Sequence, residues 1–500
     1  MKESYSRIVE LRRRVFAEVA RIAYEDLDVE SLEDASYRLF PGEMPQYREN
    51  MFRERAIADE RIRLAMGMPI RRIDVYKRVT DGFDKVDIDT NAYEKPLVNV
   101  IKFACEACPT RAIYVTDNCR RCMAHPCTNV CPVNAVSIGK TRAHIDPEKC
   151  VKCGRCENTC PYNAIVDYDR PCAAACGVNA IGSDQYGRAE IDHDKCVACG
   201  RCISECPFGA IADKTQIYQV IKAIKAGKKL YGAIAPSFIG QFGQRTSPMQ
   251  VFEAIKHLGF TDVIEVGLGA DLTTLHEAKE YLERVPEDIP FMGTSCCYSW
   301  ALMIKNMFPE YAEQISDSGS PMRYTAEYIK SIDKDAVVVF IGPCTSKKLE
   351  SLDTNIKSSV DFVITFEELM GMFVAKNIEP SEIEIDSTVE DASALGRGYP
   401  VAGGVANAVK EVAQKLDPTR EIKVEGANTL SECVKMMKLA KAGRKNGYLL
   451  EGMACPGGCI AGVGTIASTT RVKKNLDKFI NESQYKYPFD NKKIEKQNIE

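Results

Sequence analysis

The stretch AHIDPEKCVKCGRCENTCPYNAI (143–165) returns as AEIDHDKCVACGRCISECPFGAI (189–211), so one cysteine-rich module occurs twice in the chain. Two cysteines upstream of the first copy also recur before the second, at an offset of 45 positions. The signature Cys-Pro-x-x-Ala-Ile/Val ends both copies and recurs at Cys108 and Cys131, and at Cys176 with Gly in place of Pro. This self-similarity predicts a duplicated module that is itself built from two half-modules.

Within each copy the cysteines follow the spacing Cys-x2-Cys-x2-Cys-x3-Cys-Pro, which binds [4Fe–4S] clusters in bacterial-type ferredoxins. Three closely spaced thiolates can wrap one cubane, while the turn at the proline directs the fourth toward a second cluster. Zinc is the alternative, because paired Cys-x2-Cys turns also form tetrahedral zinc sites. Two complete runs, together with a variant run from Cys119 to Cys131, favour iron–sulfur clusters.

Sixteen of the 22 cysteines lie between Cys105 and Cys206, enough for four cubanes with none left over. Cross-ligation predicts three sets: Cys119, Cys122, Cys127 and Cys160; Cys131, Cys150, Cys153 and Cys156; and Cys176, Cys196, Cys199 and Cys202. The second module lacks counterparts of Cys119 and Cys122, so we expect a fourth set of Cys105, Cys108, Cys172 and Cys206. The sequence therefore predicts a row of three to four clusters that carries electrons.

The composition excludes several classes of protein. With 70 acidic and 66 basic residues, the chain lacks the positive excess of a nucleic-acid-binding protein, and 45% hydrophobic residues argue against disorder. No apolar run is long enough for a membrane span, and Glu18 and Arg21 interrupt what would be a signal-peptide core. We therefore expect a cytoplasmic protein without a membrane span, in which reduced thiols serve metal or redox chemistry.

Four regions differ in composition. Residues 1–100 lack cysteine and show apolar residues at helical spacing, which predicts a mostly helical segment. Residues 101–213 form an α+β ferredoxin-like repeat domain, and residues 471–500 are a polar C-terminal tail or surface helix. In 214–470, apolar runs such as VVVFIGPC (337–344) alternate with helical patterns, which predicts an α/β domain with parallel sheets.

Six cysteines follow residue 213, and five of them lie in turn-rich loops. Cys433 stands apart, and we interpret it as a buried packing residue. The loops contain TSCC followed by Trp (294–300), PCTSKKLE (343–350) and EGMACPGGC (451–459). Three such segments, in this order, resemble the signature segments of the [FeFe]-hydrogenase catalytic domain. The resemblance covers about residues 214–470, and it implies two parallel-sheet lobes around an active site.

The resemblance implies a cofactor and its ligands. Cys297, Cys344, Cys455 and Cys459 match the ligands of the [4Fe–4S] cubane of the H-cluster, and Cys459 also bridges to a diiron unit with CO, cyanide and azadithiolate. Lys347 matches the lysine that pairs with a cyanide ligand. The residues that match the lining of the diiron pocket are Ala235, Pro236, Ser237 and Met453.

The resemblance also implies a proton relay. Cys296 matches the thiol that passes protons to the cofactor, followed by Glu277, Glu280 and Ser316, with Arg284 at the outer end. Glu277 and Glu280 are three apart and share one helix face, although from the sequence alone a solvated helix face is the simpler interpretation. Glu350 is expected to support this path or its surroundings.

Several positions depart from the family's pattern. Tyr298 replaces a proline, Gly342 a methionine, Arg323 a glutamine, and GVGTI (462–466) stands for GGGQP. We predict a divergent ferredoxin-type [FeFe]-hydrogenase that interconverts H2 with two protons and two electrons in anaerobic hydrogen metabolism. Its implied partners are ferredoxin or a similar soluble carrier and maturation proteins for the diiron unit, and a homodimer stays open. The alternatives are a hydrogenase-like iron–sulfur assembly or scaffold protein and a low-turnover H2 or redox sensor.

Overall fold

A computed structural model describes residues 7–85, 95–356 and 358–495 of the chain, so parts of the first and last expected regions (1–6, 86–94 and 496–500) lie outside the described residues. The N-terminal region is helical. Its elements are α1 (Arg7–Tyr24), η1 (Val29–Leu32), α2 (Ala35–Leu39), α3 (Met51–Ala65) and η2 (Phe83–Lys85). Helix α1 buries an apolar face that packs against α8 (Ile217–Lys225) and α14 (Phe366–Ala375), so this region is attached to the large domain.

The cysteine-rich region consists of short hairpins and single-turn helices. Its first strand, β1 (Val98–Val100), pairs antiparallel with its last strand, β8 (Ile211–Asp213). The region therefore begins a few residues before the expected boundary at 101. The other antiparallel pairs are β2 (Ala112–Val115) with β5 (Ile165–Tyr168), β3 (Val136–Ile138) with β4 (Ala143–Ile145), and β6 (Ile181–Ser183) with β7 (Ala189–Ile191). The helices are α4 (Pro126–Asn129), α5 (Arg155–Thr159), α6 (Pro171–Ala174) and α7 (Arg201–Glu205).

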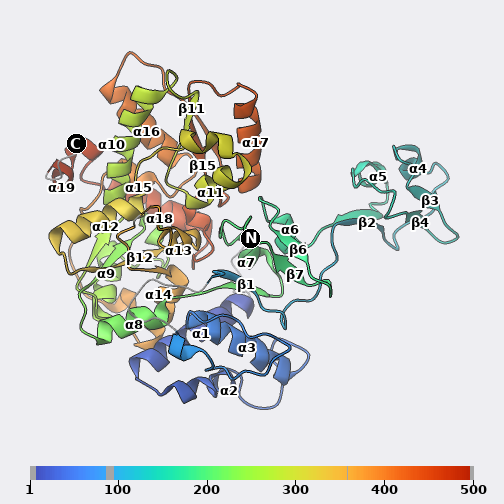
Figure 1. Ribbon diagram of the computed structural model, residues 1–500, viewed down its shortest axis with the longest axis horizontal. Coiled ribbons are helices and arrows are strands. Elements are labelled where there is room, and N and C mark those ends of the chain that lie inside the picture. The colour runs from blue at the N-terminus through green and yellow to red at the C-terminus, as the bar shows by residue number, and fades with distance from the viewer. Residues whose placement is uncertain (1–6, 86–94, 357, 496–500) are drawn as a thin grey trace.

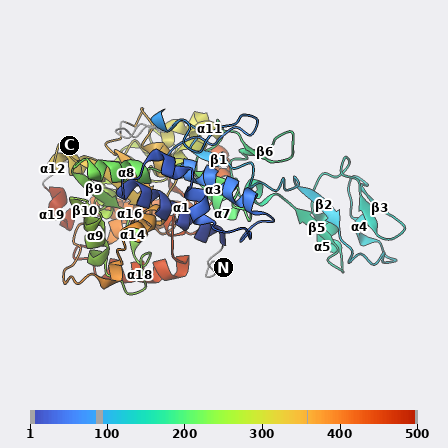
Figure 2. The same ribbon diagram turned by 90° about the horizontal axis from the view of Figure 1, so that it is seen from below.

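The first copy of the module stands away from the body of the molecule. Residues 112–168, here called the arm, carry β2 to β5 with α4 and α5, and they project to one side in two perpendicular views (Figure 1 and Figure 2). The second copy, with α6, α7, β6 and β7, lies against the body. The duplicated module therefore has one exposed copy and one enclosed copy.

Two parallel sheets form the large domain, as the alternation of apolar runs and helical patterns predicts. One has the order β10 (Asp262–Glu265), β9 (Leu230–Ile234), β12 (Val337–Gly342), β13 (Phe362–Thr365), and the other β11 (Phe291–Gly293), β15 (Tyr448–Gly452), β14 (Lys423–Ala427). Strand β12 is almost entirely buried, which explains its continuous apolar sequence. The α/β fold class is thereby confirmed.

Helices cover these sheets. They are α9 (Pro248–His257), α10 (Gly267–Arg284), α11 (Tyr298–Met307), α12 (Pro321–Ile332), α13 (Ser346–Glu350), α15 (Ala394–Gly398), α16 (Gly404–Leu416) and α17 (Leu430–Lys441), with η3 (Pro236–Phe238), η4 (Pro309–Gln314), η5 (Pro380–Glu382) and η6 (Cys459–Ala461). The loops after β9, β11, β12 and β15 all leave the carboxyl ends of parallel strands. Such ends are where open α/β sheets place their chemistry.

Of the two interpretations of residues 471–500, the structure supports the surface helix and not the polar tail. Helix α18 (Thr469–Asn481) buries Val472, Leu476 and Phe479 in the main hydrophobic core, and η7 (Pro488–Asp490) and α19 (Lys492–Glu495) follow it. The lysines that suggested a tail occupy the outer face of an amphipathic helix. No helix within the described residues has both the length and the apolar character needed to cross a lipid bilayer.

Candidate active site and iron–sulfur sites

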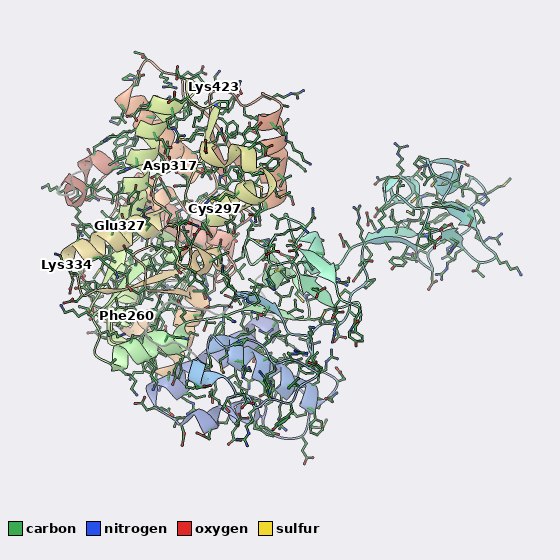
Figure 3. The ribbon with its side chains drawn as sticks, viewed as in Figure 1. Phe260, Cys297, Asp317, Glu327, Lys334 and Lys423 are labelled. Carbon is green, nitrogen blue, oxygen red and sulfur yellow. The ribbon has the colours of Figure 1, made fainter. Side chains whose placement is uncertain are left out.

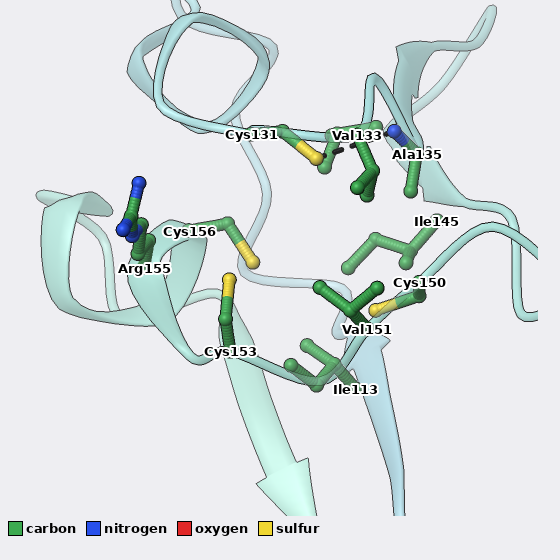
Figure 4. A pocket seen from close by; sticks show the side chains of 11 residues that line it. Ile113, Cys131, Val133, Ala135, Ile145, Cys150, Val151, Cys153, Arg155 and Cys156 are labelled. Atoms are coloured by element: carbon green, nitrogen blue, oxygen red, sulfur yellow. Dashed lines mark hydrogen bonds between the residues drawn. The ribbon is translucent and has the colours of Figure 1, made fainter.

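Four cysteines of the arm surround one cavity (Figure 4). Cys131 comes from the end of α4, and Cys150, Cys153 and Cys156 come from the run that leads into α5. Apolar side chains, among them Ile113 and Ile145, complete the wall. The cavity has the wall that a cubane held by four thiolates requires, and its four cysteines are the predicted cross-ligated set.

Two further cavities repeat this arrangement. One is lined by Cys119, Cys122, Cys127 and Cys160, and the other by Cys176, Cys196, Cys199 and Cys202. In each set, three cysteines come from one half-module and the fourth from the other. Among the described residues, no three Cys, His, Asp or Glu side chains converge on a single point as a lone metal ion would require.

The Cys-Pro-x-x-Ala signature has a structural role that its sequence did not reveal. The backbone N–H of its alanine donates to the cysteine sulfur, over 3.2 Å at Cys131 and Cys176, 3.3 Å at Cys206 and 3.4 Å at Cys160. Hydrogen bonds from amides to a thiolate favour its charged form, which is the form that binds metal. The signature is therefore a hydrogen-bonded turn that prepares one ligand.

The expected fourth set has the same local structure as the other three. The amide of Ala143 donates to the sulfur of Cys119 over 3.4 Å, and the amide of Ala189, 46 positions later, donates to Cys105 over 3.4 Å. The first Cys-x2-Cys turn of each of the four sets has its third residue in the left-handed region, at Ala107, Arg121, Lys152 and Ala198. Cys105 and Cys108 thus occupy in the second module the place of Cys119 and Cys122 in the first.

Cys172 and Cys206 complete this fourth group. Burial, together with the nearby Cys206 and Cys105, raises the pKa of the Cys172 thiol to about 11. Arg170 donates to the carbonyl of Cys108 through Nε over 3.0 Å and through Nη2 over 2.5 Å, and to the carbonyls of Gly182 and Gly187. The buried Arg170 thereby fixes the chain around Cys108.

In the large domain, the cysteines of the three signature loops meet at the strand ends. Cys297 precedes α11, Cys344 precedes α13, and Cys455 and Cys459 follow β15 (Figure 3). Burial raises the pKa of each of these thiols, and the charge of Cys297 raises the pKa of Cys344, Cys455 and Cys459 further. Four enclosed thiols at one place form a cradle suited to a cubane, whose iron ions would stabilise the thiolates.

A lysine and a glutamate flank this cradle. Lys347 donates from Nζ to the carboxylate of Glu350 over 2.5 Å and to the carbonyl of Cys296 over 3.0 Å. The second oxygen of Glu350 accepts the hydroxyl of Ser320. Burial lowers the pKa of Lys347, but Glu350 and Cys296 outweigh burial and raise it overall, so the ammonium stays charged. Glu350 therefore holds Lys347 rather than extending the line of carboxylates on α10.

Cys296 is adjacent to the inner carboxylate of the expected relay. Glu277 is completely buried, and its Oε1 accepts hydrogen bonds from the amide of Ser295 over 2.6 Å and from its hydroxyl over 2.8 Å. Burial raises the pKa of Glu277 to about 7, despite these two bonds. Burial also raises the pKa of Cys296 well above its usual range, with Glu277 adding to the rise. Near neutral pH, the carboxyl can therefore both accept and release a proton.

The outer residues form a line from this buried carboxyl to the surface. Ser316 donates to Glu280 Oε2, Arg284 pairs with Glu280 Oε1, and Arg284 Nη1 lies 3.5 Å from Asp317. The exposed fraction of the side chains rises along this line, from 15% for Glu280 through 25% for Arg284 to 90% for Asp317. The structure thus brings the expected residues together in one direction, from the cysteine cradle to solvent.

Sequence reasoning missed three polar residues of this site. Ser295 binds Glu277, and Ser320 binds Glu350, as described above. Tyr399 is buried, and its hydroxyl lies 2.8 Å from Thr274 Oγ1. Burial is the main cause of its raised pKa, and the charges of Glu277 and Cys296 raise the pKa further. Tyr399 is far from the signature segments in sequence, so the fold alone could reveal it.

Residues expected to line a cofactor pocket lie beside the cradle. Ala235, Pro236 and Ser237 follow β9, and Met453 follows β15, all of them buried. Ser237 Oγ and Glu277 Oε2 are buried without a hydrogen-bond partner. Orphaned polar atoms beside an enclosed thiol cradle fit a site that accepts a further polar group, as the diiron unit would be.

The departures from the family's pattern have local explanations. A Cβ at Gly342 would lie 2.6 Å from the Phe340 ring and 3.3 Å from Ala235, so this position has room for glycine only. Tyr298 donates to Asp353 over 2.7 Å, and Arg323 pairs with Glu327 over 2.7 Å. Tyr298 and Arg323 therefore each bind a carboxylate of this chain.

Hydroxyl groups join the second module to the catalytic loops. Ser299 and Ser346 donate to the carbonyl of Val197 over 3.0 and 3.3 Å, and Thr345 donates to the carbonyl of Ala198 over 2.7 Å. Cys199, which follows directly, lies close enough to Cys297 for the two thiols to influence each other's charge. The cavity of the Cys176 set and the cradle are therefore neighbours.

Together, the cysteine-lined cavities and the fold define an iron–sulfur protein in which a ferredoxin-like region adjoins an α/β domain. Comparison with known families supports this class. Residues 228–463 match the family described as the iron only hydrogenase large subunit, C-terminal domain, and residues 143–166 and 116–134 match 4Fe-4S binding domains. Residues 228–463 are therefore similar to the C-terminal domain of the iron-only hydrogenase large subunit, and a region similar to 4Fe-4S binding domains precedes them.

Curated relatives agree with this assignment. Iron hydrogenase 1 of Clostridium pasteurianum is 30% identical over 370 residues, covering 64% of each chain, and the NADP-reducing hydrogenase subunit HndD of Solidesulfovibrio fructosivorans is 27% identical over 367 residues, covering 63% of this chain and 55% of that one. The chain thus spans less than two thirds of these relatives. The cytosolic Fe-S cluster assembly factor NAR1 of Meyerozyma guilliermondii is 31% identical over 134 residues, 24% of this chain and 25% of that one. A solved [FeFe]-hydrogenase from Chlamydomonas reinhardtii covers 54% of this chain and 88% of its own, at 23% identity and a TM-score of 0.46.

Proposed function

We propose that this protein is an [FeFe]-hydrogenase that interconverts H2 with two protons and two electrons. The observation that carries the proposal is that one short loop joins the cradle to the buried carboxyl: Ser295 donates two hydrogen bonds to Glu277, Cys296 follows it, and Cys297 belongs to the cradle. A cubane alone needs neither a fifth cysteine beside it nor a line of titratable groups from it to solvent. The supporting evidence is the similarity of residues 228–463 to that family, together with this line of side chains.

The residues present fit the H-cluster. Cys297, Cys344, Cys455 and Cys459 would hold its cubane, and the buried segment 235–237 and Met453 would enclose the diiron unit. When bound, that unit supplies the metal centre at which the bond of H2 is broken or formed. The protein's contribution is enclosure, a fixed positive charge and a path for protons.

Each polar residue then has a defined task. Lys347, held by Glu350, places an ammonium beside the anionic ligands of the diiron unit. The thiol of Cys296 would exchange a proton between the cofactor and Glu277, and Ser316 and Glu280 would pass it outward to solvent. Arg284 cannot take the proton, but its guanidinium pairs with Glu280 and holds that carboxylate at the outer end of the path. Glu277 suits this task because burial brings its pKa to about 7.

Electrons leave or arrive through the second module. The Cys176 set adjoins the cradle, and the fourth set adjoins it in turn, because Cys172 influences the pKa of Cys202. The two sets of the arm lie farthest out (Figure 1). A ferredoxin or similar soluble carrier would exchange electrons there, and maturation proteins would supply the diiron unit.

An iron–sulfur assembly factor is the second candidate, and the similarity to NAR1 over 134 residues favours it. Such a protein would use the cysteine cradle for a cubane without a diiron unit. Under this alternative, Cys296, Lys347 and the α10 carboxylates would have no catalytic task.

An activity assay separates the candidates. The full chain is loaded with [4Fe–4S] clusters, half of the sample is matured with the diiron unit, and H2 formation is measured with a reduced electron donor. We expect rapid H2 formation in the matured sample only. Equal and negligible rates in both samples, with all clusters present, would favour assembly, and slow but definite turnover would favour a sensor.

A further inference from the structure

The N-terminal helical region has no cysteine, yet its arginines reach the backbone around two ligands of the fourth cysteine group. Helix α3 packs next to β8, and its Ile57 and Leu64 share a hydrophobic cluster with Cys206 and Ala210 (Figure 1). Cys105 lies against the same cluster. A region of unassigned purpose therefore covers the fourth group directly.

Three guanidinium groups from this region donate to carbonyls that precede Cys105 or follow Cys206. Arg53 Nε donates to the carbonyl of Phe103 over 2.8 Å, and Arg48 Nη2 donates to Phe208 over 2.6 Å and Ala104 over 3.4 Å. Arg61 Nη2 donates to the carbonyl of Gly209. These contacts each bridge 50 or more residues of sequence, so they are a feature of the tertiary fold.

Arg61 differs from Arg48 and Arg53 in two ways: it is more deeply buried, and its charge is not paired with a carboxylate within the described part of the chain. Its side chain is 5% exposed, and its Nε has no hydrogen-bond partner. Among the described residues, no carboxylate forms a salt bridge with it, and the negative charges that stabilise it are those of Cys206 and, to a smaller extent, of Glu367, which is itself paired with Arg12. A buried cation without an anionic partner is costly, unless an anion occupies the neighbouring site.

A [4Fe–4S] cluster with four thiolates is such an anion. We propose that the N-terminal region sets the potential of the cluster held by Cys105, Cys108, Cys172 and Cys206, with Arg61 as the buried cation that favours the reduced state. On reduction the cluster takes up one electron, and no bond of the protein forms or breaks. A nearby positive charge stabilises the added negative charge and raises the reduction potential.

Because of where this cluster would lie, a change in its reduction potential would affect electron transfer between the arm and the body. On one side, Cys172 of this group influences the pKa of Cys202, which belongs to the Cys176 set. On the other side, Cys108 helps to raise the pKa of Tyr168, the last residue of strand β5 in the arm. This cluster is therefore the step between the exposed clusters of the arm and the clusters of the body. A raised reduction potential would keep this cluster reduced for a larger fraction of the time, so that it could pass an electron to the arm or to the body.

The inference rests on the iron–sulfur part of the proposed function and not on H2 turnover, so its test uses protein without the diiron unit. The full chain is loaded with iron and sulfide, and its clusters are titrated with dithionite and mediator dyes, followed by electron paramagnetic resonance. A Cys172→Ala variant identifies the signal of the fourth cluster as the component that it removes.

Arg61→Gln removes the charge but keeps a polar side chain, and Arg61→Lys keeps the charge. For a unit charge about 10 Å away at an effective dielectric constant of about 20, we expect the ratio of reduced to oxidised cluster at a fixed potential to fall about tenfold in Arg61→Gln. That is a shift of about 59 mV to more negative potential. Arg61→Lys should shift the midpoint much less, and the other cluster signals should not move.

Arg63→Gln is the matched control. Arg63 is also a buried arginine of α3, but it donates to the carbonyls of Pro69, Val79 and Asp81 inside the N-terminal region. A selective negative shift in Arg61→Gln, absent in Arg63→Gln, supports the proposal. An unchanged midpoint in Arg61→Gln, or an equal shift in both variants, overturns it. Should Arg61→Gln lose the cluster, Arg48→Gln replaces it, and an unchanged midpoint there overturns the proposal in the same way.

Discussion

Replacing Glu277 by Gln tests the proton path with little disturbance of the structure. The amide oxygen of Gln can accept both hydrogen bonds that Ser295 donates to Glu277 Oε1. Its amide nitrogen would take the place of Oε2, which is buried without a partner. The variant therefore keeps the shape and the contacts of the site but removes its titratable proton.

The size of the effect follows from the burial of this carboxyl. Its pKa rises from the ordinary 4.5 to about 7, which corresponds to about 3 kcal/mol, since one pKa unit is about 1.36 kcal/mol. About half of the Glu277 side chains are then protonated at pH 7, against about one in three hundred for an exposed glutamate. Loss of a positioned acid and base lowers turnover by about 10²- to 10⁴-fold.

The sign of the pH dependence is fixed as well. Because the folded pKa lies above the unfolded one, the folded state binds more protons between pH 4.5 and about 7. The contribution of Glu277 to stability is complete below pH 4.5 and is lost as the pH rises through 7. The Gln variant lacks this loss, so its stability relative to the wild type should increase over that window.

Two measurements check this prediction. The difference between the infrared spectra of the wild type and Glu277→Gln should contain a protonated-carboxyl component that titrates with a midpoint near pH 7, beside the unchanged components of Glu265, Asp271 and Glu368, and H2 turnover should fall at least 100-fold. Glu283→Gln, an exposed position on the same helix, is the control and should change neither. Wild-type turnover in Glu277→Gln, or a carboxyl midpoint near 4.5, would refute the reasoning.

Other substitutions test neighbouring parts of the account. Cys296→Ser should abolish most H2 turnover while iron analysis shows a full set of clusters, whereas Cys433→Ser, at a buried cysteine outside the cradle, should retain turnover; equal activity of both variants would contradict the relay. Lys347→Met leaves Glu350 buried without its cation, so we expect weaker retention of the diiron unit, measured by its infrared bands, and unchanged bands would speak against this role. Lys348→Met breaks a completely buried ion pair with Glu368 and should destabilise the fold by about 3–5 kcal/mol in denaturant unfolding, while a cost below about 1 kcal/mol would show that the pair is dispensable.

Much of the iron–sulfur architecture could be predicted from the sequence because it depends on local spacing. Repeated Cys-x2-Cys turns bring their thiols together within a few residues, and three of the expected four-cysteine sets line one cavity each. The α/β class was equally accessible, since buried parallel strands such as β12 have continuous apolar sequences.

Other features depend on contacts between distant segments. Tyr399 and Ser320 reach the site only through the packing of α15 and α12 around the strand ends, and no local pattern marks them. The arginines of α3 bind backbone carbonyls, which any sequence provides, so their partners could not be inferred. For residues 471–500 the sequence left both a tail and a surface helix open, because the few apolar residues of α18 are separated by lysines, and only the fold shows the helix.

The most direct test of the central claim is the infrared spectrum of the full chain after maturation with the diiron unit. The account predicts stretching bands of CO and cyanide that change under H2 and disappear when Cys459, the proposed bridge between cubane and diiron unit, is replaced by Ala. Absence of these bands in a protein whose cysteine cradle holds its cubane would contradict the assignment as a hydrogenase.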